Sequence, residues 1–214
     1  MHADDERVKR RYDTTRRRAT ADRTRRAILD AATTLFVEQG YVATTMASIA
    51  QRAGVNTDTV YTAVGAKPAL FRLLIETALS GEDDAVPAAD RDYVRDMQAE
   101  PDAASKLAIY AAAISRIHVR LGPLFGVLQT AAPASPELAA LWQQIAERRA
   151  ANMRLLAADL ATTGQLRIEV QEAADVIWAT NSPEFYLLLV RDRQWTHEHY
   201  ERWLADSWCR LLLT

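Results

Sequence analysis

Apolar positions recur along this chain at helical spacing, and the alternation that marks strands is nowhere sustained. From Ile28 to Phe36 they follow one another in three- and four-residue steps, which predicts an amphipathic helix. It would begin after Asp22, a residue suited to cap a helix, and end at Gly40, because glycine readily adopts the left-handed turn that closes helices. The pattern therefore predicts a first helix over residues 22–40.

Two shorter periodic segments follow and are separated by a single glycine, Gly54. Asn56 is placed to cap the second segment, and Pro68 suits the first turn of a longer helix. The predicted helices of this region cover about residues 45–53, 57–64 and 67–80. Two short helices joined at a glycine have the form of a helix-turn-helix.

The rest of the chain also has helical periodicity. We expect helices at about residues 90–99, 103–121, 123–131, 136–162, 171–191 and 196–213. The segment SGEDDAVPAADRD, from Ser80 to Asp92, is predicted to be a loop between subdomains. The predicted fold class is all-α, with an N-terminal three-helix DNA-binding domain and a C-terminal helical domain for ligand binding and dimerisation.

Charge divides the chain further. The net charge is −2, yet residues 7–26 hold 10 basic and 2 acidic side chains. An excess of basic groups at one end favours contact with an anionic partner. We therefore expect a basic flexible arm over residues 1–21, followed by the helix-turn-helix domain over 22–66 and the helical C-terminal domain over 67–214.

The second short helix leaves its hydrogen-bonding side chains outside the core. Short polar side chains at the amino end of a helix suit base edges in the major groove, and hydroxyls, a lysine and the helix terminus suit phosphates. Residues 22–71 resemble the DNA-binding domain of the TetR family of transcriptional regulators, through ILDAATTLFVEQGYVATTMASIAQRAGV, then TVY, then Lys67 and ALF.

This resemblance implies base contacts from Thr57, Asp58 and Tyr61, and phosphate contacts from Thr45, Thr59, Thr62 and Lys67. The chain departs from the family at Val64, where many members have phenylalanine, and at Thr57 and Thr62, where longer basic residues are frequent. Two roles stay open, because Asp58 can instead complement the helix dipole and Tyr61 can be packing. The basic arm can likewise be a solvated tail.

The last two predicted helices are apolar on more than one face, as in AADVIWATNSPEFYLLLV. A helix that is apolar on both sides needs two partners, so we expect a homodimer formed through these helices. Pro183 should kink the first of them and free a carbonyl near Thr180 and Asn181. The resemblance implies a small-molecule effector between the C-terminal helices. The predicted cavity residues are Tyr110, Ile114, His118, Phe125, Trp142, Asn152, Trp178, Asn181 and Tyr186.

Nothing in the sequence indicates an enzyme, a cofactor or a metal. His197 and His199 are two residues apart and point to different helix faces, and no phosphate-binding glycine loop or nucleophile elbow occurs. A single cysteine and a charged start predict a soluble, cytoplasmic protein without a membrane span. The expected function is a dimeric repressor that binds a palindromic operator in double-stranded DNA and is released by an unknown small-molecule effector. Two alternatives remain: a DNA-binding protein without effector, and an all-α carrier or enzyme.

Overall fold

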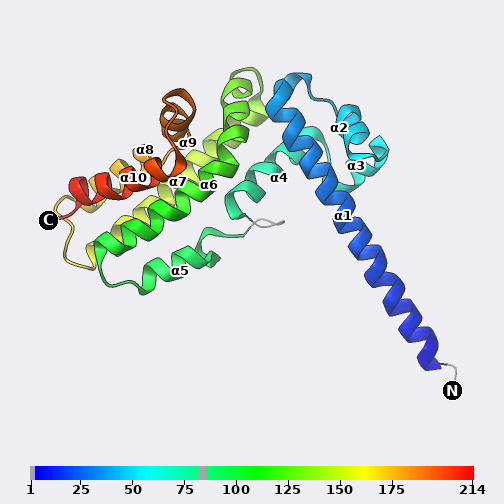
Figure 1. Cartoon of the computed structure of the whole chain (residues 1–214), viewed down its shortest axis with the longest axis horizontal. Helices are drawn as coiled ribbons and strands as arrows, with labels where there is room; N and C mark the ends of the chain where they lie inside the picture. The colour runs from blue at the N-terminus through cyan, green and yellow to red at the C-terminus, as the bar shows by residue number, and fades with distance from the viewer. Residues whose placement is uncertain (1–2, 82–85) are drawn as a thin grey trace. The chain divides into compact units, whose positions relative to one another are not determined.

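The computed structural model describes residues 3–81 and 86–214, and side chains from residue 18 onward, Ala89 excepted. Every element over these residues is helical, and one isolated bridge joins Leu166 to Leu213. The chain divides into two compact units, Met1–Leu74 and Ile75–Thr214, coloured blue to cyan and green to red in Figure 1. Part of the predicted loop between residues 80 and 92 lies outside the described residues.

The first helix, α1 (Ala3–Ala43), begins earlier than the pattern predicts. Residues 3–21 hold six arginines and lack glycine and proline, so helix propensity alone permits the extension. Asp22 is therefore inside the helix and not its cap. The predicted break at Gly40 is present, because this residue has φ 79° and ψ 171°. The apolar face from Ile28 to Phe36 is buried as predicted.

Three more helices complete the N-terminal unit: α2 (Met46–Ala53), α3 (Thr57–Val64) and the first turns of α4 (Lys67–Ser80). The unit extends past residue 66, where we had expected it to end. Phe71 explains the difference, because it is fully buried and its ring meets that of Phe36 edge to face at 5.0 Å. The beginning of α4 is thus part of the core of this unit.

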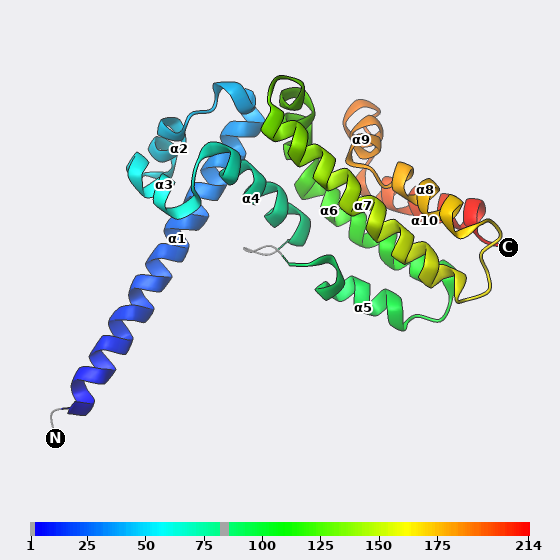
Figure 2. The same ribbon diagram turned by 180° about the vertical axis from the view of Figure 1, so that it is seen from behind.

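The C-terminal unit is built around α6 (Ala103–Ala131), which packs against α5 (Asp92–Ala99), α7 (Pro136–Ala161), α9 (Pro183–Tyr186) and α10 (His197–Leu212). The helix α8 (Val170–Thr180) packs mainly on α7. Figures 1 and 2 show α5 and α10 on opposite sides of the α6–α7 pair. Two short 3₁₀ turns, Ala88–Asp90 and Ala132–Ala134, precede α5 and α7.

Two predicted helix boundaries in this unit are wrong. The helices expected at 103–121 and 123–131 are one helix, which continues through the exposed Pro123. Leu121, Leu124 and Phe125 lie on one buried stripe, and burial of several such side chains outweighs the roughly 3 kcal/mol cost of an internal proline.

The helix expected at 171–191 is in fact three segments. It ends at Thr180, and Pro183 starts α9 as its first residue with Ser182 as the cap, so Pro183 begins a helix and does not kink one. A π-helical segment, Leu187–Asp192, follows α9.

The last helix contributes less apolar surface than its sequence indicates. Tyr200, Leu204, Trp208 and Leu212 are fully buried within the unit, so they belong to its own core and are not available to a partner. Apolar side chains that remain at least a third exposed on the last segments are Val170, Trp178, Leu188 and Leu211. Cys209, on the same helix, is half-buried, and burial raises the pKa of its thiol.

The helix α6 is also the longest apolar element. The segment Ala103–Ala134 is long and apolar enough to cross a membrane by length and composition alone, but 61% of its most apolar window is buried inside this unit. The core helix of a folded domain has the same length and apolar composition.

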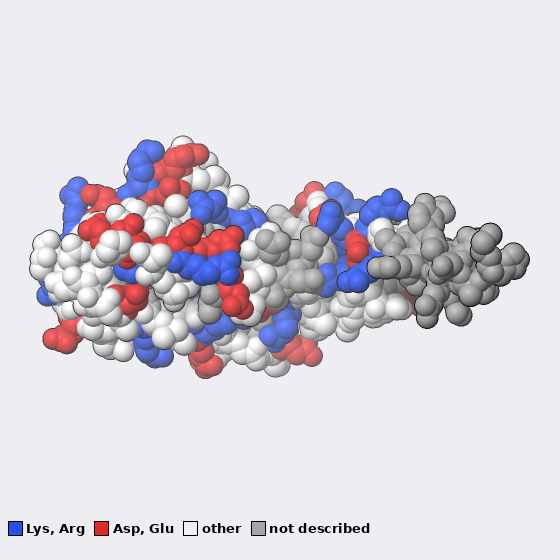
Figure 3. All heavy atoms as spheres, turned by 90° about the horizontal axis from the view of Figure 1, so that it is seen from below, with Lys and Arg blue, Asp and Glu red and all other residues white. Residues whose placement is uncertain are grey.

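On the face shown in Figure 3, acidic and basic side chains are interspersed over the C-terminal unit.

Candidate DNA-binding surface and effector cavity

The turn between α2 and α3 is held by helix caps at both sides. Thr45 accepts the Ser48 N–H at 3.0 Å while its own N–H donates to the Ser48 hydroxyl at 3.0 Å, which forms a capping box at the start of α2. Gly54 ends α2 in the left-handed region, with φ 69° and ψ 29°. The Asn56 side chain then accepts the Thr59 N–H at 2.7 Å. These caps fix where α3 begins and which face it buries.

The helix α3 buries Val60 and Val64 and directs its polar side chains outward. Asp58 and Thr62 are exposed, and Tyr61 has 49% of its surface accessible. Thr57 and Thr59 are partly exposed. A helix whose amino end carries exposed tyrosine, aspartate and threonine side chains has the form of a recognition helix.

The threonine hydroxyls of this surface are not equivalent. Thr59 donates to the Asn56 side-chain oxygen at 2.7 Å, and Thr62 donates to the Asp58 carbonyl at 2.8 Å. The Thr45 hydroxyl lies 3.2 Å from that of Ser48. A hydroxyl has one hydrogen to donate and a phosphate oxygen can only accept, so each of these three must first rotate to bind a phosphate. Among the described residues, the Thr57 hydroxyl has no such internal acceptor.

Lys67 has a structural role in addition to its charge. Its ammonium nitrogen donates to the Val42 carbonyl at 3.4 Å and lies 4.3 Å from the centroid of the Tyr41 ring. The partial burial of this group lowers its pKa from the ordinary value. The side chain thus ties the start of α4 to the end of α1, and an ammonium group keeps further donors for a phosphate.

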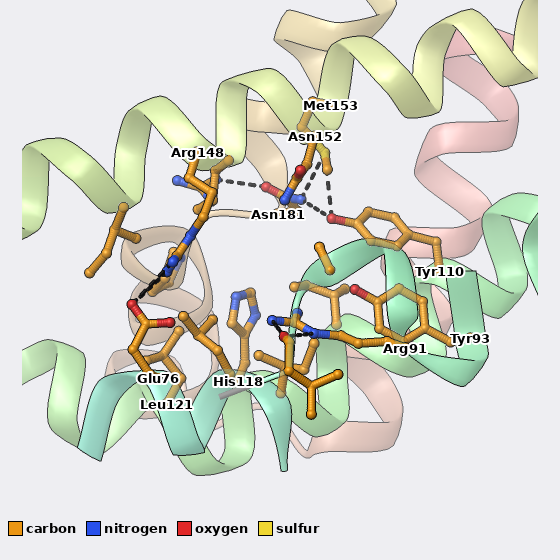
Figure 4. A pocket seen from close by; sticks show the side chains of 18 of the residues that line it. Glu76, Arg91, Tyr93, Tyr110, His118, Leu121, Arg148, Asn152, Met153 and Asn181 are labelled. Carbon is orange, nitrogen blue, oxygen red and sulfur yellow. Dashed lines mark hydrogen bonds and ion pairs between the residues drawn. The ribbon is translucent and has the colours of Figure 1, made fainter. Parts of the chain in front are cut away.

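The C-terminal unit contains a cavity of about 280 Å³ (Figure 4). Five of the nine predicted cavity residues line it: Tyr110, Ile114, His118, Asn152 and Asn181. The break after α8 explains why Asn181 faces inward, since the residue follows the last turn of that helix and is 1% exposed. Two further hollows adjoin the cavity and share Tyr93 with it, one of about 590 Å³ that is more open and one of about 150 Å³.

The other four predicted residues lie outside the cavity lining. Phe125 is in the core and meets Trp142 edge to face at 5.4 Å. Trp178, one turn before the break, is 37% exposed, and its indole N–H donates to the Ala146 carbonyl. The Tyr186 ring packs against Gly122, and its hydroxyl lies 2.9 Å from His197 Nδ1.

Buried polar groups at the upper end of the cavity in Figure 4 satisfy one another. The Asn181 amide nitrogen donates to the Tyr110 hydroxyl at 2.5 Å, and its oxygen accepts from Arg149 at 2.7 Å. The Tyr110 hydroxyl also lies 3.4 Å from the Met153 sulfur. Burial raises the pKa of Tyr110, so the phenol stays neutral. Such a satisfied network fixes the shape of this wall.

His118 is neutral at this site. It is 1% exposed, and burial, together with the positive charge of Arg149, lowers its pKa to about 3. Its Nδ1 lies 3.3 Å from the Tyr200 hydroxyl. The positive charge around the cavity therefore comes from arginine alone.

The sequence analysis missed the charged lining. Arg91, Arg148, Arg149 and Glu76 all line the cavity, and none of them is among the predicted cavity residues. A signal was available for Arg149. It lies four residues after Ile145 and four before Met153, so it falls on the apolar stripe of α7.

The architecture combines an N-terminal unit that contains a helix-turn-helix with a separate helical unit that contains a cavity. Residues 28–74 match the profile described as bacterial regulatory proteins, tetR family. This match assigns the N-terminal segment to the DNA-binding domain of that family. Comparison with curated protein sequences gives no match.

Solved structures support this assignment of the fold. NalD of Pseudomonas aeruginosa, the secondary repressor of the MexAB-OprM multidrug efflux pump, is 19% identical with a TM-score of 0.68, covering 91% of this chain and 98% of that one. SmeT in complex with triclosan is 20% identical with a TM-score of 0.65, covering 89% of this chain and 92% of SmeT. A putative transcriptional regulator of Saccharomonospora viridis in complex with choline is 17% identical with a TM-score of 0.66, covering 89% of this chain and 97% of that one.

Proposed function

We propose that this chain is a homodimeric repressor that binds a palindromic operator through α3 and is released by a small organic effector in the C-terminal cavity. One observation carries the proposal: a single chain combines an outward-facing recognition helix with a separate unit that contains a cavity. A protein of this kind works in the cytoplasm, where the chromosome of a bacterium lies.

DNA contact would be divided between bases and phosphates. Tyr61, Asp58 and Thr57 are the side chains offered to base edges, since they are exposed or have no competing internal acceptor. Lys67 and the hydroxyls of Thr45, Thr59 and Thr62 are offered to phosphates, the three hydroxyls after rotation. The basic segment over residues 7–26 adds charge that favours any duplex.

Dimerisation is supported by the exposed apolar side chains of the last segments. Val170 and Trp178 on α8, Leu188 after α9 and Leu211 on α10 each leave more than a third of their surface in water. Burying such groups against a second copy is favourable at roughly 25 cal/mol per Å². Two copies would present two α3 helices, as a palindromic operator requires, with half-sites about 34 Å apart.

The neighbouring folds support release by a ligand. NalD is named as a repressor, and the SmeT and Saccharomonospora viridis structures hold triclosan and choline respectively. In this chain a molecule of similar size has a cavity of about 280 Å³ available, close to the lower end of ligand sites.

Selection of bound duplexes from a random DNA pool tests the DNA-binding part of the proposal. We expect a palindrome with two half-sites about one helical turn apart, and binding that weakens as salt rises because phosphate contacts release counterions. The purified protein should elute as a dimer and bind one palindrome per dimer. Selection without any preferred sequence, or binding by a monomer, would contradict it.

A further inference from the structure

The arginine in the middle of α7 has an unusual environment. Arg149 is partly buried, and its terminal nitrogen donates to two neutral acceptors, the Trp178 carbonyl and the Asn181 side-chain oxygen. Over the described residues no carboxylate lies within ion-pair distance of its guanidinium. Burial lowers the pKa of Arg149, but an arginine remains protonated in a protein. A positive charge is therefore held at this wall without a direct counterion.

One negative charge acts on Arg149 without contact to it. Glu184 on α9 raises the pKa of Arg149 through space, and one of its oxygens is buried without a hydrogen-bond partner in the described part of the chain. Glu184 does not line the cavity. A partly buried cation whose counterion is out of contact is costly, and an anion that reaches it recovers part of that cost.

The rest of the cavity wall adds more positive charge than negative. Arg148 donates two hydrogen bonds of 3.1 Å to one oxygen of Glu76, and Arg91 donates to the Val86 carbonyl. Glu76 is the lining carboxylate among the described residues, whereas three arginines line the cavity. Figure 4 shows the Arg148 side chain directed towards Glu76. Since His118 is neutral, the lining favours an anion.

Most of the remaining wall is hydrocarbon. The apolar lining residues include Leu79, Ile114, Ile117, Leu121 and Ile145. A ligand that fills the cavity must therefore combine a small charged head with an apolar body. A volume of about 280 Å³ accommodates a short chain or a single ring system, since ligand sites typically begin at about 300 Å³.

We infer that the effector is a small monocarboxylate with an apolar body, whose carboxylate binds Arg149 and whose hydrocarbon part lies against Ile114 and Ile145. The inference rests on the proposed function, which it deepens by naming the chemical class of the effector. Arginine suits this ligand because its planar group matches both oxygens of a carboxylate. Glu76 opposes the binding, since it is a like charge in the same cavity and occupies Arg148.

Three probes of matched length separate charge from hydrocarbon: octanoate, octanamide and octylammonium. Isothermal titration calorimetry of the full-length protein at neutral pH should give octanoate at least about tenfold tighter binding than octanamide, because hydrogen bonds to charged groups are worth that much or more. Octylammonium should bind more weakly than either. Equal binding of octanoate and octanamide, preference for octylammonium, or no binding of octanoate would overturn the inference.

Two variants test the residues. Arg149→Gln should remove the preference for octanoate over octanamide. That variant also loses contacts to Trp178 and Asn181 and can fail to fold. A second variant, Glu76→Gln, is therefore expected to bind octanoate more tightly than the wild type. It removes the opposing charge and frees Arg148, so octanoate binding should tighten severalfold, an effect that misfolding cannot mimic. Arg154→Gln, on the exposed face of α7, is the matched control and should change the affinity for neither octanoate nor octanamide.

The same protein samples separate this inference from the proposed function. None of the substituted residues belongs to the helix-turn-helix, so DNA binding measured by fluorescence anisotropy should persist in each folded variant. Octanoate should release the selected operator from the wild type and, at lower concentration, from Glu76→Gln. Operator binding that persists while octanoate fails to bind contradicts the carboxylate inference alone, whereas a wild type without operator binding contradicts the proposed function.

Discussion

Tyr61 is an aromatic side chain that the protein core does not use. It has 49% of its surface exposed on a helix whose Val60 and Val64 are buried. Tyr61→Ala should therefore cost about 1–3 kcal/mol of operator binding and relax base preference at one position, with little change in the melting temperature. Gln51→Ala, also exposed but on α2, is the control. A loss of thermal stability with unchanged operator affinity would show that Tyr61 is a packing residue.

His118 should make the stability of the protein depend on pH. Its folded-state pKa of about 3 lies below the ordinary 6.5. Above pH 6.5 the imidazole is neutral in both states, whereas between pH 6.5 and 3 only the unfolded chain binds a proton. The free energy of unfolding should therefore fall as pH drops through this window, by up to about 1.4 kcal/mol per pH unit from this group.

Urea unfolding of the wild type and His118→Gln at several pH values measures this contribution. The variant should be less stable at neutral pH, yet its stability should fall less steeply towards pH 4, because its amide does not titrate. The groups that face His118 are Tyr186, Tyr200 and Arg149, none of which titrates in this range. Parallel curves for the two proteins would contradict the assignment.

At the scale of single elements, two glycines of α6 are predicted to behave in opposite ways. A Cβ at Gly122 would lie 2.8 Å from Tyr186 Cε1, and that ring is held by His197, His118 and Tyr200. Gly122→Ala should cost about 1–3 kcal/mol through overpacking.

Gly126 is the matched comparison, four residues further along the same helix. A Cβ there would meet its nearest atoms at 3.8 and 3.9 Å, which are ordinary contacts. Gly126→Ala should leave stability unchanged or raise it by up to about 1 kcal/mol, because alanine loses less backbone entropy in a helix. Urea denaturation of both variants measures the difference in the free energy of unfolding. A similar loss of stability at both positions would show that the close approach of the Tyr186 ring to Gly122 does not cause the loss.

Elements with strong local signals could be predicted from the sequence. The periods, caps and glycines of α2 and α3 agree with one another, so their bounds follow from local chemistry alone. Residue Pro123 and the segment after Thr180 could not be assigned by the same rules. At Pro123, burial of the neighbouring apolar side chains outweighs the cost of a proline inside a helix. After Thr180, Ser182 and Pro183 start a new helix although the apolar pattern continues without interruption.

The cavity was only partly predictable, for a related reason. Inward-facing residues of α6, such as Tyr110 and His118, follow from helix periodicity. Trp178 and Tyr186 were predicted to line the cavity beside a kink at Pro183, but α8 ends before that proline and neither residue is in the lining. Arg149 was not predicted to line the cavity because charged side chains are mostly exposed, and only the packing of α7 shows that this one is partly buried.

At the scale of the whole molecule, the proposed dimer depends on a small number of apolar side chains. Leu211 on α10 is 46% exposed, and Leu211→Glu should shift the protein towards monomer in analytical ultracentrifugation. Leu155→Glu is the control, since that leucine is 72% exposed on α7, outside the last segments. We expect the control to remain dimeric with unchanged operator binding. Two dimeric variants would place the interface elsewhere on the protein.

The lone thiol on α10 gives experimental access to that arrangement. Because the sequence holds one cysteine, a nitroxide or fluorophore attached at Cys209 would mark one site per subunit without prior mutagenesis. Its half-buried position and raised pKa mean that the reaction needs mildly alkaline conditions and long incubation. Pulsed dipolar spectroscopy between two such labels would then report how far apart the terminal helices of associated copies are held, with and without operator.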